Sequence, residues 1–181
     1  MPLTLASRSP QRRAILEQLG VRFDVVVPEV EETSEGDPRG MVVENALRKA
    51  RAVAGELVLG ADTTVVVDGQ IIAKPSDEED ARRMLRLLSG RWHEVLTGVA
   101  LVRAESGHAL VAHERTRVRF AATSEDEIDW HVRTGDVLDK AGAYAIQGRA
   151  ALFIEAIDGD YWNVVGLPVR LVYELARGLE E

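Results

Sequence analysis

Residues 3–19 place a strand, a short serine-containing turn and a helix in direct succession, and this order constrains the fold more than any other stretch. Residues 3–5 are typical of a short strand. Ser9 suits the N-cap of the helix, and Pro10 suits its first position, where a missing N–H costs nothing. The apolar residues recur at helical spacing, which predicts a buried face made of Ile15, Leu16 and Leu19.

The same stretch carries an unusual charge. Arg8, Arg12 and Arg13 crowd the beginning of the helix, where the helix dipole disfavours cations. Backbone N–H groups, the hydroxyls of Ser7 and Ser9 and guanidinium forks together form an anion site suited to phosphate. The alternative is that the arginines point into solvent, and this stretch alone leaves both interpretations open.

The order of the later elements predicts an α/β fold with a mixed, twisted central sheet and helices on both sides, because strands and helices alternate first and strands then follow one another. A buried strand is expected at 23–27, an acidic loop at 29–36, and a helix from Asp37 with Val43, Leu47, Ala50 and Ala54 on one face. The other expected elements are strands at 57–59, 65–67, 70–73, 91–103, 108–121 and 151–157, and helices at 76–88 (capped by Ser76 and Glu79), 124–134 and 168–179. The length of 181 residues fits one domain, 1–181, with room for two lobes.

The composition excludes several classes of function. The formal net charge of −8 argues against a general nucleic-acid or membrane-surface binder, because both partners are acidic. The chain has no cysteine, which excludes disulfides, thiol nucleophiles and cysteine metal sites. No signal peptide or membrane-spanning stretch is recognisable, so a cytoplasmic location is expected.

Asp62 is the first candidate for chemistry. It follows a predicted buried strand, and carboxylates at strand ends of α/β sheets line the crevice where ligands bind. The alternative is an aspartate that caps a turn. Glu31 and Glu32 lie in the acidic loop, where simple solvation competes with a role as Mg²⁺ ligands beside phosphate.

The lysines are few, at positions 49, 74 and 140. Lys49 lies in a helix, Lys74 follows a hairpin and Lys140 lies in a glycine-rich loop. A helical lysine is usually a solvated charge. In a chain that otherwise uses arginine, however, a compact ammonium suggests contact with a phosphoryl oxygen as a point charge. The four histidines show no metal-ligand spacing, and His93 is expected to order a strand.

Five motifs in order carry a family resemblance: LASRSPQRR, GADTTV with AKP, HEVLTGVAL, KAGAYAIQG and GDYWNVVGLP. From Leu5 to about Pro168 the chain resembles the Maf-type nucleotide pyrophosphatases, also called septum formation inhibitor Maf proteins. The resemblance implies two lobes around a cleft, as in Maf and inosine-triphosphatase-like folds, and frequent dimers. It also implies hydrolysis of nucleoside triphosphates to monophosphate and pyrophosphate with Mg²⁺ or Mn²⁺, a house-cleaning of nucleotide pools.

The resemblance also assigns roles to residues. It implies Asp62 as the catalytic group that orients or deprotonates water, and Asp62 with Glu32 as metal ligands. The phosphate-binding positions it implies are Ser7, Ser9, Arg12, Lys49 and Lys74, and the specificity positions are Gln11, Thr63 and Gln147.

Gln11 departs from the arginine usual in the dTTP/UTP subgroup, whereas Gln147 favours that subgroup. The amide of Gln147 suits the O4/N3 edge of uracil or thymine. The expected substrates are therefore dTTP and UTP. A 7-methyl-GTP-type pyrophosphatase, a general inosine-type triphosphatase and a non-catalytic nucleotide-binding regulator of cell division remain the alternatives.

Overall fold

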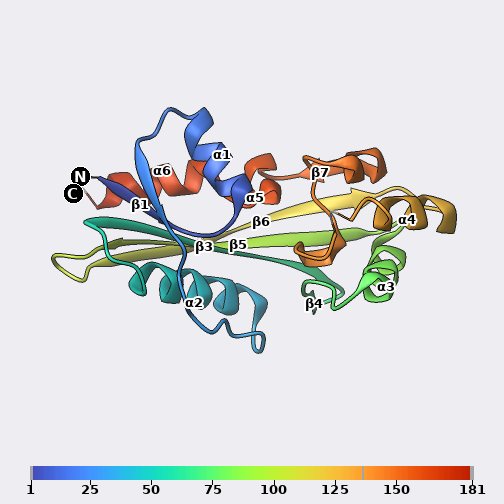
Figure 1. The fold of residues 1–181 in the computed structure, drawn as a ribbon, viewed down its shortest axis with the longest axis horizontal. Coiled ribbons are helices and arrows are strands. Elements are labelled where there is room, and N and C mark those ends of the chain that lie inside the picture. The colour runs from blue at the N-terminus through green and yellow to red at the C-terminus, as the bar shows by residue number, and fades with distance from the viewer. Residues whose placement is uncertain (1, 136, 180–181) are drawn as a thin grey trace. The chain divides into compact units, whose positions relative to one another are not determined.

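The structure, a computed structural model, describes residues 2–135 and 137–179. Its described strands form one mixed sheet in the order β2-β1-β3-β5-β6-β7, with β4 paired to β3 (Figure 1). The strands are β1 Leu3–Ala6, β2 Phe23–Val26, β3 Leu57–Val67, β4 Gln70–Ile72, β5 Trp92–Arg103, β6 Ala109–Phe120 and β7 Ile154–Asp158. The helices are α1 Pro10–Gln18, α2 Pro38–Arg51, α3 Glu78–Leu88, α4 Glu125–Val132, α5 Tyr161–Val165 and α6 Val169–Gly178, with 3₁₀ turns at Ala141–Ala143 and Arg149–Phe153. The predicted α/β class is confirmed.

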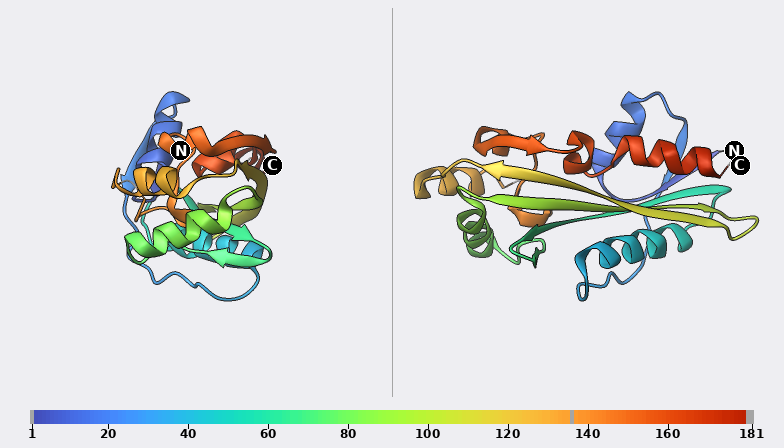
Figure 2. Two further views of the ribbon diagram at one scale, coloured as in Figure 1. Left: turned by 90° about the vertical axis from the view of Figure 1, so that its right-hand side faces the viewer. Right: turned by 180° about the vertical axis from the view of Figure 1, so that it is seen from behind.

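The chain divides into two compact units, and the first, unit 1, contains residues 1–63, 97–114 and 166–181. In unit 1, β1 pairs in parallel with both β2 and β3. Helix α2 covers one face of this part of the sheet, and α1 and α6 cover the other, as Figures 1 and 2 show. A buried cluster that includes Ala46, Ala50, Val58 and Ala100 lies under α2.

The second unit, unit 2, contains residues 64–96 and 115–165. Its core contains buried residues of α3 and of the C-terminal end of β6, among them Ala81, Met84, Leu85, Leu88, Val118 and Phe120. Helices α3 and α4 are joined by Arg82, whose Nε donates to Asp129 at 2.7 Å. Strands β6 and β7 pair in antiparallel. The predicted inner face of α3 and the Ser124–Glu127 capping box of α4 are confirmed.

Two strand predictions were wrong in ways that bear on function. Strand β3 runs unbroken from Leu57 to Val67, so Asp62 lies in its interior rather than at a strand end. The polar side chains of Asp62 and Thr63 are accommodated within the strand because they have hydrogen-bond partners on neighbouring elements. Strand β2 is not buried, because it is the edge of the sheet and Val25 and Val26 are exposed.

Smaller corrections concern helix ends and faces. The cap of α3 is Asp77, whose carboxylate accepts from the Asp80 N–H at 2.8 Å, one residue later than predicted. Leu19 is half exposed, because α1 ends at Gln18. Strand β7 begins at Ile154, since a 3₁₀ turn occupies the preceding residues. The short helix α5 was not predicted. No helix in the described ranges has the length and apolar character that crossing a membrane requires.

Candidate active site

Two glycines allow α2 to approach the sheet of unit 1 closely. A Cβ on Gly60 of β3 would stand 2.1 Å from the Ala46 carbonyl oxygen, and a Cβ on Gly98 of β5 would stand 2.1 Å from that of Val42. Any larger residue would therefore push the helix away. Because side chains two residues apart share a face of a strand, Asp62 points to the same side as Gly60. The inner face of α2 is thus pressed against Asp62.

The carboxylate of Asp62 is held by two side chains of α2. Its Oδ1 accepts from Lys49 Nζ at 2.7 Å, and its Oδ2 accepts from Asn45 Nδ2 at 3.0 Å. All three residues are buried, with Asp62 7% and Lys49 8% exposed as whole residues. A buried charge needs such partners, because an unpaired one costs several kcal/mol.

Lys49 also pairs with the acidic loop. Its Nζ lies 2.9 Å from Glu32 Oε1, so one ammonium stands between the carboxylates of Glu32 and Asp62. The Glu32 side chain is half exposed, whereas that of Lys49 is 10% exposed. The alternative of a solvated helical lysine is therefore wrong. The predicted inner face of α2 was wrong as well, since Asn45 and Lys49 belong to it and Ala54 is exposed.

Arg12 comes from α1 and reaches three acceptors in unit 1. Its Nε donates to the Gly166 carbonyl at 2.8 Å, its Nη2 to Thr63 Oγ1 at 2.9 Å, and its Nη1 to Ser7 Oγ at 3.3 Å. The side chain is buried, while Arg8 is exposed. The interpretation that the arginines point into solvent thus fails for Arg12.

Burial lowers the pKa of Arg12 from its ordinary value, and the negative charges of Asp62 and Glu32 oppose that shift. The guanidinium stays cationic, because arginine is not deprotonated in proteins. Two cations and two carboxylates thus interact in unit 1. Such a cluster of charges is costly for folding alone and is typical of a functional site.

The hydroxyls of Ser7 and Ser9 make hydrogen bonds within the turn between β1 and α1. Ser9 is the N-cap, and its Oγ accepts from the Arg12 N–H at 3.3 Å and donates to Gln11 Oε1 at 3.1 Å. Ser7 Oγ accepts from the Ser9 N–H at 3.1 Å. Gln11 therefore orders the turn through Ser9 in this structure.

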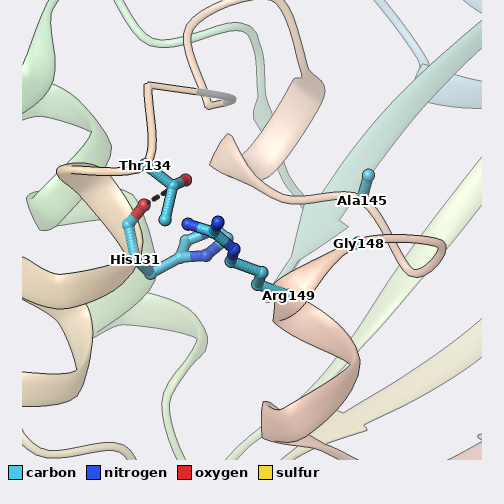
Figure 3. A pocket seen from close by; sticks show the side chains of 5 residues that line it. All are labelled: His131, Thr134, Ala145, Gly148 and Arg149. Carbon is cyan, nitrogen blue, oxygen red and sulfur yellow. Dashed lines mark hydrogen bonds between the residues drawn. The ribbon is translucent and has the colours of Figure 1, made fainter.

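The candidates Lys74 and Gln147 lie in unit 2. Lys74 is exposed and makes no ion pair with any described side chain. Gln147 is exposed too. Its neighbours Ala145 and Gly148 line a cavity of about 220 Å³ together with His131, Thr134 and Arg149. Figure 3 shows Arg149 extending toward His131, whose carbonyl accepts from the Thr134 hydroxyl at 2.7 Å.

Sequence reasoning missed two residues of the site. Asn45 contacts Asp62, and Thr97 Oγ1 lies 2.9 Å from Thr63 Oγ1. Asn45 precedes Lys49 by four residues, which places both on one side of a helix. A polar residue at this spacing, among the apolar residues of that side, was the available signal.

Glu32 and Asp62 are the carboxylates of the site that could hold a divalent metal. The carboxylates of Glu32 and Asp62 both lie within 3 Å of the Lys49 ammonium, which occupies the point between them. Mg²⁺ takes one or two carboxylates and completes its shell with water and phosphate oxygens. No group of three His, Cys, Asp or Glu side chains gathers at a metal site in residues 2–135 and 137–179. Two carboxylates match the number that Mg²⁺ takes from a protein, and each keeps lone pairs that Lys49 does not use.

His93 has a structural place in unit 2. Its Nε2 lies 2.6 Å from the Tyr144 hydroxyl, and its ring meets Phe120 edge-on at 5.1 Å between centroids. Burial lowers the pKa of His93 to about 4 and raises the pKa of Tyr144. Both groups are therefore neutral at pH 7.

This lowered pKa predicts a loss of stability in mild acid. Between about pH 6.5 and pH 4 the unfolded chain binds a proton at His93 that the folded chain does not. The free energy of unfolding should therefore fall by about 2 kcal/mol between pH 7 and pH 5 from this group alone. Urea unfolding of the wild type and of His93→Gln, which keeps a hydrogen-bonding amide, checks this. Equal pH slopes in both proteins would contradict it.

Comparison with known proteins identifies the family and the fold to which the chain is related. A dTTP/UTP pyrophosphatase of Symbiobacterium thermophilum is 55% identical over 96% of this chain and 91% of its own. One from Anaeromyxobacter dehalogenans is 52% identical over 97% and 92%. The structure of the Staphylococcus aureus Ham1 protein superposes with a TM-score of 0.57 over 98% of this chain and 99% of that one, at 14% identity, which shows a shared fold. The family model described as Maf-like protein matches residues 2–179, and the chain therefore belongs to the Maf-like protein family.

Proposed function

We propose that the protein hydrolyses nucleoside triphosphates, dTTP and UTP above all, to the nucleoside monophosphate and pyrophosphate. The observation that carries this is the ammonium of Lys49 between Asp62 and Glu32. The names of the relatives support the reaction and its substrates. We further propose that residues 1–181 act as one functional domain that clears nucleotide pools in the cytoplasm.

Arg12 and Lys49 are the proposed phosphate contacts of unit 1. A guanidinium has five N–H donors, and Arg12 gives three of them to Gly166, Thr63 and Ser7. Two donors therefore remain for phosphate oxygens, and the three fixed bonds orient them in advance. Lys49 adds a positive charge that offsets the charge developing on the leaving pyrophosphate.

Asp62 is the proposed base. An ionised carboxylate has about four lone-pair sites, and Lys49 and Asn45 occupy one on each oxygen. Asp62 can therefore still accept a proton from water. The water oxygen forms a bond to the α-phosphorus, the bond from that phosphorus to the bridging oxygen breaks, and pyrophosphate leaves with the bond electrons.

Asp62 and Glu32 are the residues that would hold Mg²⁺ or Mn²⁺, because each carboxylate keeps lone pairs that its bond to Lys49 does not use. A bound divalent ion polarises a phosphoryl oxygen and lowers the pKa of a bound water.

In unit 2, we propose that Lys74 contributes a further positive charge and that Gln147 reads the base through its amide. Gln11 accepts a hydrogen bond from Ser9 of the proposed phosphate-binding turn, and Thr63 accepts one from Arg12.

A panel of nucleotides tests the proposal. We expect pyrophosphate and monophosphate in equal amounts, with dTTP and UTP turned over fastest, when the purified chain is incubated with Mg²⁺ or Mn²⁺. Release of orthophosphate instead of pyrophosphate would refute the reaction. A preference for 7-methyl-GTP or for inosine triphosphate would refute the pyrimidine assignment. Binding without turnover would favour the nucleotide-binding regulator.

We also propose that the chain forms a homodimer through β2. This strand is the edge of the sheet, and the valines at 25–27 are exposed beside it. In an antiparallel pairing that sets Phe23 opposite Phe23 of a second copy, Arg22 of each copy faces Asp24 of the other. Opposite charges at such positions stabilise a strand pair. The open edge is thus complementary to itself in charge.

Light scattering of the purified chain should give twice the chain mass, and Val25→Asp should give the single mass, because it places a carboxylate in the paired edge. Val111→Asp is the matched control, since Val25 and Val111 are both 42% exposed. A monomeric wild type, or a dimer that survives Val25→Asp, would refute this interface.

A further inference from the structure

Asn45 makes three hydrogen bonds from a side chain that is only 2% exposed. Its Oδ1 accepts from the Thr33 N–H at 2.8 Å, and its Nδ2 donates to the Thr33 carbonyl at 2.9 Å. The same Nδ2 donates to Asp62 Oδ2 at 3.0 Å. One amide thus joins the acidic loop, α2 and β3 within unit 1.

The two bonds to Thr33 fix the acidic loop at the residue next to Glu32. Residues 27–36 have no helix or strand of their own, so their backbone is held by hydrogen bonds to side chains and to water. With Thr33 fixed by Asn45, the adjacent Glu32 lies where its carboxylate reaches Lys49 at 2.9 Å. The position of one charged group of the site therefore depends on Asn45.

The third bond fixes the plane of the Asp62 carboxylate. Lys49 holds Oδ1 and Asn45 holds Oδ2, so neither oxygen can rotate without breaking a bond. The amide accepts from the Thr33 N–H and donates both to the Thr33 carbonyl and to Asp62, whereas a hydroxyl has only one proton to donate. An aspartate at position 45 would set a second carboxylate against Asp62, and an apolar residue would release both partners.

We propose that Asn45 is a positioning residue that fixes Asp62 and the Glu32 loop in one arrangement for catalysis. This inference rests on the proposed function, since it assigns to Asn45 the task of orienting that site. Asn45 touches the catalytic carboxylate, not the substrate, so its loss should lower kcat far more than it raises KM.

The test compares Asn45→Leu, which removes all three bonds at similar volume, with the wild type. We expect kcat for dTTP and UTP to fall by about ten- to hundred-fold, because small misplacements of reacting groups cost that much, with KM changed less than about three-fold. Glutamyl endopeptidase, followed by mass spectrometry, should cut the nucleotide-free variant faster after Glu31 and Glu32, by about ten-fold if the loop is released. The matched control is Met41→Leu on the same inner face of α2, which should leave both readouts unchanged.

Unchanged kcat, or unchanged cleavage of the loop, would overturn the inference. If Asn45→Leu fails to fold, Asn45→Asp decides by kcat, because it loses the bond to Asp62; its loop should be cut less readily than that of Asn45→Leu, because it retains an acceptor for the Thr33 N–H. A wild type that releases no pyrophosphate would refute the proposed function instead. In that case the cleavage assay still shows whether Asn45 holds the loop.

Discussion

Asp62→Asn should lower the rate of pyrophosphate release by about 10²–10⁴-fold, the range typical of a lost general base. The variant keeps the shape of the side chain and an oxygen for Lys49, so the fold should persist. It removes the charge that would take the proton and ligate a metal, and it turns an NH₂ group toward either Lys49 or Asn45. Single-turnover kinetics at saturating metal measure the loss of rate, and circular dichroism shows separately whether the fold persists.

The matched control is Asp126→Asn, which makes the same chemical change at an exposed position of α4. Its rate should stay within about two-fold of the wild type, because surface substitutions away from specific contacts have small effects. If Asp62→Asn turned over as fast as Asp126→Asn, Asp62 would be neither the base nor an essential metal ligand.

Local patterns were sufficient where neighbours in sequence decide the structure. The strand at Leu3, the Ser9 cap with Pro10 and the inner face of α3 follow from spacing and capping chemistry, and the structure contains all of them. The burial of β2 could not be predicted this way, because a valine-rich run lies inside or at an edge according to the sheet order. That order depends on long-range pairing, here β1 between β2 and β3.

The site shows a similar division. Asp62 and Lys49 were recognised from residue type and family motifs, yet their surroundings were misjudged. Polar residues inside β3 resembled a strand end, and a lysine on α2 resembled a solvated charge. Both errors have one cause: α2 lies so close to Gly60 that polar side chains are buried against one another. Asn45 escaped notice because a single asparagine in a helix carries no motif.

Arg12 shows most clearly what the sequence alone could not decide. A cation at the beginning of a helix opposes the dipole, so the sequence predicts that Arg12→Ala leaves the nucleotide-free protein as stable or makes it more stable. The structure reverses this expectation. Three acceptors would lose this donor: the buried ones on Gly166 and Ser7 and the half-buried one on Thr63.

Arg12→Ala should therefore lower both turnover and the melting temperature of the nucleotide-free protein. Unpaired buried acceptors and the lost countercharge for Asp62 should cost about 2–4 kcal/mol, which corresponds to a fall of about 5–15 °C in melting temperature. Arg13→Ala is the matched control, since Arg13 is exposed on the same helix and pairs with Glu17 at 2.8 Å, a contact worth about 0.5 kcal/mol. Calorimetry of both variants, with turnover measured well below their melting temperatures, distinguishes the two effects. Equal melting temperatures for the two variants would mean that the dipole penalty outweighs the three bonds, and the expectation from the sequence would stand.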